Sequence, residues 1–244
     1  MSLVDLAINV IFPLSLVIFI FGFFYNVIQY FIIPGAPRAY SPPRKISVIK
    51  KLLMPVIKWL STFKFIIKKN PLHGFTAIFM FHLPLLAVML LFPPHQAVIF
   101  SILPFLRVIL EPFAIPQQPT ETFFTNRTIW GPLEVIVNAD VLALITIFSI
   151  MIIMGLRIVK HATGEFASTV GDYFALIITL LILVFGYLAT HAHGTPYYET
   201  YLAAHIISAS FLIAYVPFSK FFHFVWSYWV NLIVLAYHRM RKGV

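Results

Sequence analysis

Two of the nine histidines in this chain are separated by a whole number of helical turns. His205 and His223 are 18 residues apart, which is five turns at 3.6 residues per turn. On one straight helix both rings face the same side, ~27 Å apart along the axis. Two haems stacked across a membrane need one axial nitrogen at each of these depths, and histidine is a usual axial ligand of haem iron. The alternative is two histidines that only form hydrogen bonds with neighbouring helices.

Cysteine is absent from the 244 residues, which narrows the possible chemistry. Without thiolates this chain holds no disulfide, no cysteine-ligated zinc, no iron–sulfur cluster and no covalently attached c-type haem. The nine histidines are then the soft nitrogen ligands available to a metal.

The composition is that of a membrane protein. Apolar residues make up 61% of the chain and charged residues 10%, against ~25% charged in an ordinary soluble domain. A soluble fold of this length would have too few polar residues to cover its surface, and a lipid bilayer removes that problem. The net charge of +9 does not indicate nucleic-acid binding, because the charges lie at the ends of apolar runs, where they set membrane orientation.

Five apolar segments are long enough to cross a bilayer as helices, at ~20 residues each. We expect an all-α bundle of about five transmembrane helices, forming one membrane domain over residues 1–244 of a multi-pass protein of the cell membrane. Residues 96–110 are apolar but short, which favours an interfacial or re-entrant segment. The expected spans are Leu6–Pro37, Leu72–Phe92, Ile136–Leu156, a fourth that starts after Asp172 and ends near Thr190, and a fifth from near Tyr201 past Lys220.

Basic residues are concentrated on one side of these spans. Residues 38–69 carry nine Lys or Arg, and the stretch Ile46–Ile67 alternates lysine with apolar residues at roughly helical spacing. This pattern predicts an amphipathic surface helix within a cytoplasmic insert; a solvated basic loop is the alternative. The segment after the third span and the C-terminus are also basic, whereas residues 191–199 contain no Lys or Arg. The positive-inside rule therefore predicts an N-terminus outside the cell and a C-terminus in the cytoplasm.

A specific motif surrounds the two histidines of the fifth span. His205 is followed by eleven residues, then Pro217-Phe218-Ser219-Lys220, two residues and His223. This segment resembles the last helix of the gamma subunit of respiratory nitrate reductase. It also resembles the related cytochrome b subunits of membrane heterodisulfide reductase and of sulfite-reductase-associated complexes. Gly171-Asp172-Tyr173-Phe174 is similar to the start of the same family's fourth helix, and the resemblance runs from about Leu72 to the C-terminus.

The resemblance implies that the second span supplies the two remaining haem ligands, and the candidates are His73, His82 and His95. His82 and His95, with twelve residues between them, are similar to the sulfite-reductase-associated branch. The nine-residue spacing of His73 and His82 is close to the ten residues of the nitrate reductase branch. Spacings of 13 and nine residues rise ~20 and ~14 Å, against ~27 Å on the fifth span, so depth favours His82 with His95. His73 with His95 would share a helix face, but His73 lies four residues after Lys69, at headgroup level.

The family resemblance thus implies a dihaem cytochrome b membrane anchor. His95 and His205 would bind the outer haem b, where quinol is oxidised, and His82 and His223 would bind the inner one. Electrons would leave for an iron–sulfur partner subunit on the cytoplasmic face, and the terminal catalytic site would lie on other subunits. Three points stay open: whether the chain binds one haem or two, whether electrons flow in reverse to quinone, and which terminal acceptor is served. The alternative class is a haem-free membrane transporter or assembly anchor whose intramembrane histidines carry protons.

Four further polar groups lie near the expected membrane boundaries. His191 and His193 follow the fourth span, where either would accept a proton from quinol beside the outer haem; a plain surface loop is the alternative. Asp140, near the start of the third span, is a buried proton carrier or a solvated carboxylate, and its boundary position favours solvent. Lys220 would pair with a haem propionate or extend to the interface.

Overall fold

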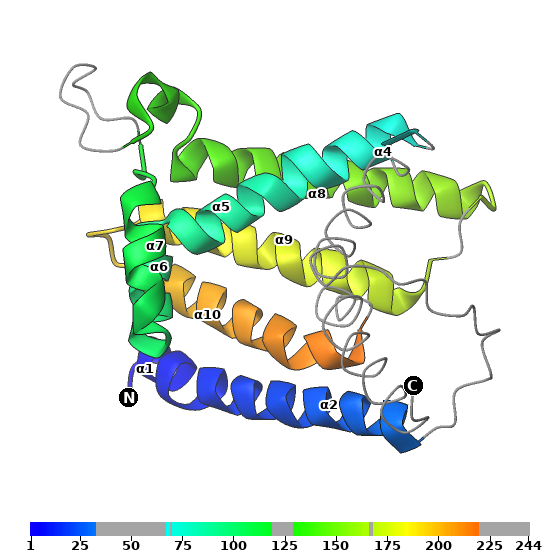
Figure 1. Ribbon diagram of the computed structural model, residues 1–244, viewed down its shortest axis with the longest axis horizontal. Helices are drawn as coiled ribbons and strands as arrows, with labels where there is room; N and C mark the ends of the chain where they lie inside the picture. The colour runs from blue at the N-terminus through cyan, green and yellow to red at the C-terminus, as the bar shows by residue number, and fades with distance from the viewer. Residues whose placement is uncertain (33–66, 69, 119–128, 166–167, 220–244) are drawn as a thin grey trace, which may run out of the picture. The chain divides into compact units, whose positions relative to one another are not determined.

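The computed structural model describes residues 1–32, 67–68, 70–118, 129–165 and 168–219. Within these residues the regular elements are helices, with no strand among them. Five of the described helices are long and apolar enough to cross a membrane (Figure 1). The predicted fold class, an all-α membrane protein of about five spans, is therefore confirmed.

The spans are assembled from these helices in chain order. The first combines α1 (Leu3–Leu6), η1 (Ala7–Ile11) and α2 (Phe12–Ile32), and the second combines α4 (Pro71–Phe75), η2 (Thr76–His82) and α5 (Leu83–Leu91). The third and fourth are α8 (Ala139–Ala162) and α9 (Val170–His191), and the fifth is α10 (Tyr198–Tyr215) followed by the turn η6 (Val216–Phe218). The second span agrees with the expected one to within a residue at each end. The third begins three residues later than expected and ends six later.

Local sequence sets several of the helix starts. Ser2 accepts a hydrogen bond from the Asp5 amide at 3.1 Å, and the Asp5 carboxylate accepts one from the Ser2 amide at 3.0 Å, which is a capping box. Asn138 begins α8 by accepting from the Val141 amide at 3.0 Å. Pro71 is the first residue of α4, where a missing amide proton costs no helical bond. These caps explain why the apolar runs start as helices where they do.

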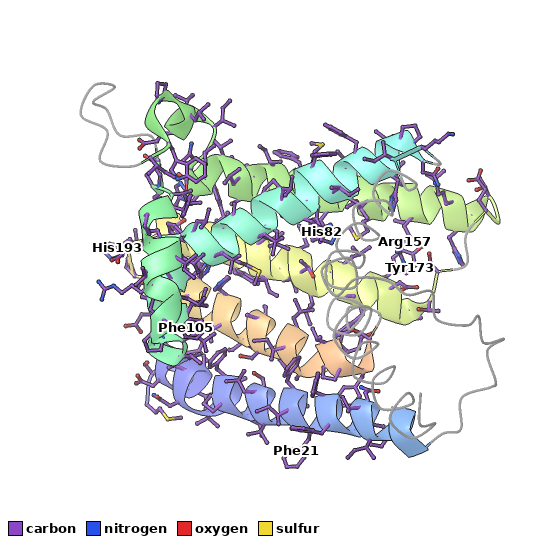
Figure 2. All side chains as sticks on the ribbon, viewed as in Figure 1. Phe21, His82, Phe105, Arg157, Tyr173 and His193 are labelled. Carbon is purple, nitrogen blue, oxygen red and sulfur yellow. The ribbon has the colours of Figure 1, made fainter. Side chains whose placement is uncertain are left out.

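Most side chains of the spans face outward. In the most apolar 18-residue window of each span, only 17% to 28% of the residues are buried. Phe21 is 72% exposed and points away from α2 in Figure 2, and Phe148 on α8 is 57% exposed. Such apolar surface is stable in lipid, where a helix also satisfies its backbone polar groups internally. The bilayer is therefore the environment that these helices fit.

Among the described residues, one compact unit contains residues 1–32, 169–182 and 192–219. Here α2 packs along α10 and reaches η6. Gly22 permits the closest approach, because a Cβ atom there would lie 2.7 Å from the Cβ of Pro217. The Tyr215 hydroxyl donates to the Gly171 carbonyl at 3.4 Å, and its ring packs edge-on against Phe174 at 5.0 Å. The start of α9 is thereby joined to the end of α10.

The other unit contains the described part of residues 65–168 together with residues 183–191. In it η2 and α5 pack on α8. Small polar side chains line this contact: Thr76 is 1% exposed, and Thr146 and Ser149 are fully buried. The two α8 hydroxyls are satisfied on their own helix, Thr146 by the Leu142 carbonyl at 2.7 Å and Ser149 by the Thr146 carbonyl at 2.8 Å. Small residues of this kind allow close helix packing in a membrane.

A group of short helices closes one end of this second unit. They are α6 (Pro93–Ile102), η3 (Pro104–Leu106), α7 (Arg107–Leu110), η4 (Glu111–Phe113) and η5 (Gly131–Val135). Phe92 leaves α5 with a ψ of 124°, and α6 then turns across the end of α5 (Figure 1). The Gln96 amide donates to the Leu110 carbonyl at 2.9 Å and ties α7 back to α6. Residues 96–110 are therefore helical but separate from the spans; their depth in the membrane stays a prediction.

A buried core supports the same end. Phe92, Ile115, Ala139 and Leu142 pack together there, and the Ile115 amide donates to the Leu91 carbonyl at 3.0 Å. The end of α5 and the start of α8 thus share one apolar cluster. The predicted amphipathic helix of the basic insert, residues 38–69, lies outside the described residues apart from Ile67 and Lys68.

Candidate functional site

His82 lies at the end of the π-helix η2, midway along the second span (Figure 2). Its ring is exposed, stands edge-on to Phe81 at 5.1 Å, and brings Nδ1 within 2.5 Å of the Ala77 carbonyl oxygen. A carbonyl only accepts, so Nδ1 carries the proton of this bond. A π-helical stretch changes the direction in which later side chains leave the helix, and such stretches occur frequently at functional sites.

His95 lies in the first turn of α6, just after the chain has turned. Its Nδ1 is 2.8 Å from the carbonyl oxygen of Val88, seven residues earlier. The Val88 carbonyl lies in the last turn of α5 and also accepts from the Phe92 amide at 3.4 Å, so it has both a helical partner and His95. The half-buried ring also packs edge-on against Phe92 at 5.7 Å. His95 is therefore held by the helix end that Pro93 creates.

His205 is a half-buried residue of α10, and it is held by a bond between helices. Its Nδ1 is 2.8 Å from the carbonyl oxygen of Ile182 on α9. A carbonyl oxygen has two lone pairs and can accept this bond in addition to its helical one. The bond fixes the direction of the imidazole within its unit.

The three histidines share one arrangement. Each presents Nδ1 to a main-chain carbonyl oxygen, at 2.5 Å for His82 and 2.8 Å for His95 and His205. A neutral imidazole that donates from Nδ1 carries its lone pair on Nε2, which is the tautomer that ligates a metal through Nε2. Metal-binding histidines almost always donate the other ring N–H to a carbonyl, a carboxylate or water in this way. The donor chemistry of these residues therefore fits haem ligation.

The described residues do not test the predicted ligand pairs. His82 and His95 belong to one compact unit and His205 to the other, while His223 lies outside the described residues. Within the described part of the chain no group of three or more His, Asp or Glu side chains is arranged to hold a metal ion. A bis-histidine haem takes only two axial nitrogens from the protein. The pairs His95 with His205 and His82 with His223 stay predictions.

The end of the fifth span differs from the straight helix that the 18-residue spacing assumes. The α-helix stops at Tyr215, η6 ends at Phe218, and Ser219 is extended with φ −121° and ψ 170°. Pro217 explains the break, because it has no amide proton to continue the helical ladder. The helix that contains His205 is therefore interrupted before position 223, and the placement of His223 lies outside the described residues.

Two other histidines near the candidate ligands are placed differently. His73 lies in the first turn of α4, close to the end of the second span as expected, and is half-buried. His193 is exposed, and its ring packs edge-on against Tyr198 at 5.1 Å. Neither residue has a described hydrogen bond from Nδ1 to a main-chain carbonyl, which is the bond that holds His82, His95 and His205.

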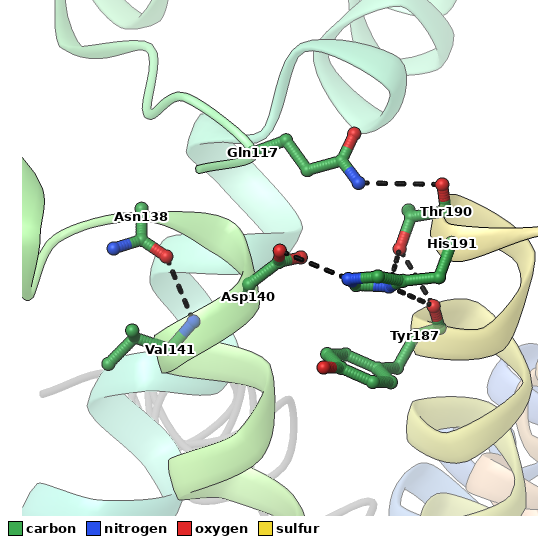
Figure 3. Close-up of polar contacts among 7 residues, drawn as sticks. All are labelled: Gln117, Asn138, Asp140, Val141, Tyr187, Thr190 and His191. Carbon is green, nitrogen blue, oxygen red and sulfur yellow. Dashed lines mark hydrogen bonds and ion pairs between the residues drawn. The ribbon is translucent and has the colours of Figure 1, made fainter. Parts of the chain in front are cut away.

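The Asp140 side chain differs from the solvated carboxylate that its position suggested. It is 14% exposed and lies 3.2 Å from Nε2 of His191, the last residue of α9 (Figure 3). Consecutive antiparallel spans place the start of the third beside the end of the fourth, and that topology is the signal that predicts this contact.

Comparison with protein families, curated proteins and solved structures finds no match to this chain.

Proposed function

We propose that this chain is a dihaem cytochrome b membrane subunit that exchanges electrons between quinol or quinone and an iron–sulfur partner subunit. The observation that carries the proposal is the shared arrangement of His82, His95 and His205, each donating from Nδ1 to a main-chain carbonyl. His191 also presents Nδ1 to a carbonyl oxygen, at 2.9 Å, but its Nε2 faces the Asp140 carboxylate. An axial ligand needs this tautomer, because Nε2 must be unprotonated to bind iron.

The ligand roles follow the sequence motif. His95 and His205 hold the outer haem b, and His82 and His223 hold the inner one. When bound, haem supplies one-electron transfer between ferric and ferrous iron. The chain's own contribution is to fix the rings: the Val88 carbonyl orients His95, and the Ile182 carbonyl orients His205. Orientation by such outer partners typically changes metal affinity by about 10- to 100-fold.

The partner is inferred from what this chain lacks and from where its charge lies. A sequence without cysteine cannot ligate an iron–sulfur cluster, so the electrons that leave the membrane need another subunit. The basic residues 38–69 and the basic C-terminus would face that subunit on the cytoplasmic side. The neighbouring membrane helices are apolar enough to keep the redox groups away from water.

Quinol-driven reduction tests this function. The purified full chain, loaded with haem in the oxidised state, is mixed under anaerobic conditions with a soluble quinol such as duroquinol. The absorption bands of ferrous haem b should appear at a rate that saturates with quinol concentration. Dithionite then gives the total reducible haem in the same sample. If dithionite reduces the haem but quinol does not, the proposal is contradicted.

A further inference from the structure

One ion-pair contact in the second unit joins the two ends of consecutive spans. Asp140 lies in the first turn of α8, and His191 is the last residue of α9. Nε2 of His191 is 3.2 Å from Oδ2 of Asp140, with side-chain exposures of 35% and 14% (Figure 3). The carboxylate is therefore mostly enclosed, while one part of the imidazole reaches the surface.

The hydrogen bonds of His191 indicate which ring nitrogen carries a proton. Its Nδ1 is 2.9 Å from the Tyr187 carbonyl oxygen and 3.2 Å from the Thr190 hydroxyl. The Thr190 hydroxyl itself donates to the Tyr187 carbonyl at 2.8 Å, so both neighbours of Nδ1 accept and Nδ1 must carry a proton. On the other side, Nε2 faces a carboxylate oxygen. A hydrogen bond between Nε2 and Oδ2 would need one further proton on this contact.

The surroundings hold the two partners in place. The Asp140 amide donates to the Gln117 carbonyl at 3.1 Å, and the Gln117 side chain donates to the Thr190 carbonyl at 3.4 Å. Tyr187 is the titratable group that contacts the imidazole, with the two rings 4.3 Å apart. A helix N-terminus favours an anion and a helix C-terminus a cation. The shared proton is therefore held in a polarised, prearranged pair.

The pair lies at the same end of this unit as His95. The His95 ring packs against Phe92, and Phe92 belongs to the buried core that contains Ala139, the residue before Asp140. The Ala139 amide donates to the Pro116 carbonyl at 2.8 Å, which fastens the start of α8 to the same loop. His95 and Asp140 are thus each linked to the same apolar core.

We propose that Asp140 and His191 together form the proton acceptor for quinol oxidised at the His95 end; this inference rests on the proposed function. Oxidation of one quinol to quinone releases two electrons and two protons; the two ferric haems of the proposed function would take up the electrons. The first proton passes from a quinol hydroxyl to the deprotonated pair and forms the Nε2–Oδ2 hydrogen bond. It then leaves to water through the exposed part of His191, and the second proton follows the same route.

Infrared spectroscopy tests the shared proton without any quinol. The full chain is titrated over pH, and difference spectra record carboxylate and imidazole bands for the wild type, Asp140→Asn and His191→Gln. A shared proton predicts one coupled titration that either substitution abolishes. If each substitution removes only its own band and leaves the other residue titrating as before, the proposal is overturned.

Quinol-driven haem reduction then tests the role of the pair. An asparagine at position 140 can still donate a hydrogen bond to Nε2, so Asp140→Asn keeps the link between α8 and α9 but cannot take up a proton. We expect both variants to reduce haem about 100-fold more slowly. Glu199→Gln, which removes an exposed carboxylate in the first turn of α10, is the matched control and should behave like the wild type.

The outcomes separate this inference from the proposed function. Haem content and dithionite-reduced spectra must be unchanged in both variants, which shows that they are folded and loaded. Wild-type rates in Asp140→Asn would overturn the proton-acceptor role while leaving the cytochrome function in place. Failure of quinol to reduce the wild type would overturn the proposed function and with it this role, whatever the infrared titration shows.

Discussion

Asn26 on α2 donates a hydrogen bond from its side-chain amide to the carbonyl oxygen of Pro217, at 2.7 Å. The same amide donates to the Gly22 carbonyl of its own helix at 2.9 Å. Pro217 lies in η6, just after the α-helix of the fifth span has ended, and its carbonyl is the one that Asn26 contacts. The first span is therefore fastened to the segment that leads toward Lys220 and His223.

Replacement of Asn26 by leucine should weaken this attachment. The variant keeps the side-chain volume but loses both hydrogen bonds, each worth about 1 kcal/mol. We expect a lower midpoint of thermal unfolding and weaker retention of the haem assigned to His223. Both are measured by recording haem absorbance during heating in detergent. Tyr25→Phe, on an exposed part of the same helix, is the control and should leave the haem spectrum and the midpoint unchanged.

Gly22 should tolerate no added side chain. A Cβ atom there would lie 2.7 Å from Pro217 Cβ and 2.9 Å from Phe218 Cζ, so Gly22→Ala forces α2 away from η6. We expect a loss of about 1–3 kcal/mol, the usual cost of overpacking. Gly155→Ala is a matched control, because nothing lies within 4 Å of a Cβ at that helical position; there alanine should be neutral or stabilising. Equal stabilities of the two variants in chemical denaturation would contradict this packing.

The ligand assignment predicts which substitutions act together. His95→Ala and His205→Ala should each remove the outer haem or make it high-spin, because iron then lacks one strong axial nitrogen. His82→Ala and His223→Ala should do the same to the inner haem. Redox titration followed by optical spectroscopy separates the two haems. His73→Ala should leave both unchanged; loss of a haem in His73→Ala together with retention in His95→Ala would show that the other pair is correct.

The charge pattern predicts the orientation in the membrane. A reporter fused after Val244 should be cytoplasmic, and one inserted at Gly194 should lie outside. Gly194 has a φ of 81° and lies in the turn between α9 and α10, so an insertion there disturbs no helix. Paired alkaline phosphatase and fluorescent-protein fusions at each position give the two readings. The reverse pattern would invert the proposed direction of the electron and proton paths.

The apolar runs were sufficient to predict the spans, because the thickness of the hydrocarbon core sets a minimum length for each helix. The second span shows this: Leu72–Phe92 was expected and Pro71–Leu91 is found. Helix interiors were less predictable. The π-helix over Thr76–His82 and the break at Ser219 depend on which carbonyl each amide and each side chain pairs with, and the spacing of apolar residues does not encode that choice.

The polar contacts between helices were the hardest part to predict. Asp140 was expected to face solvent because its own neighbours in the sequence lie at a membrane boundary. Its partner His191 comes from another helix, 51 residues later, so only the pairing of helix ends places the two side chains together. The bonds from His95 to Val88 and from His205 to Ile182 were equally hard to predict. Every residue has a main-chain carbonyl, so the sequence does not indicate which one accepts.

The content of haem tests the central claim most directly. The full chain, purified from membranes of cells supplied with haem precursor, is assayed by pyridine haemochrome spectroscopy against protein mass from amino-acid analysis. The account predicts b-type haem, extractable because no cysteine attaches it, at about two per chain. A value near one would contradict the dihaem assignment, and the absence of haem would contradict the cytochrome function as a whole.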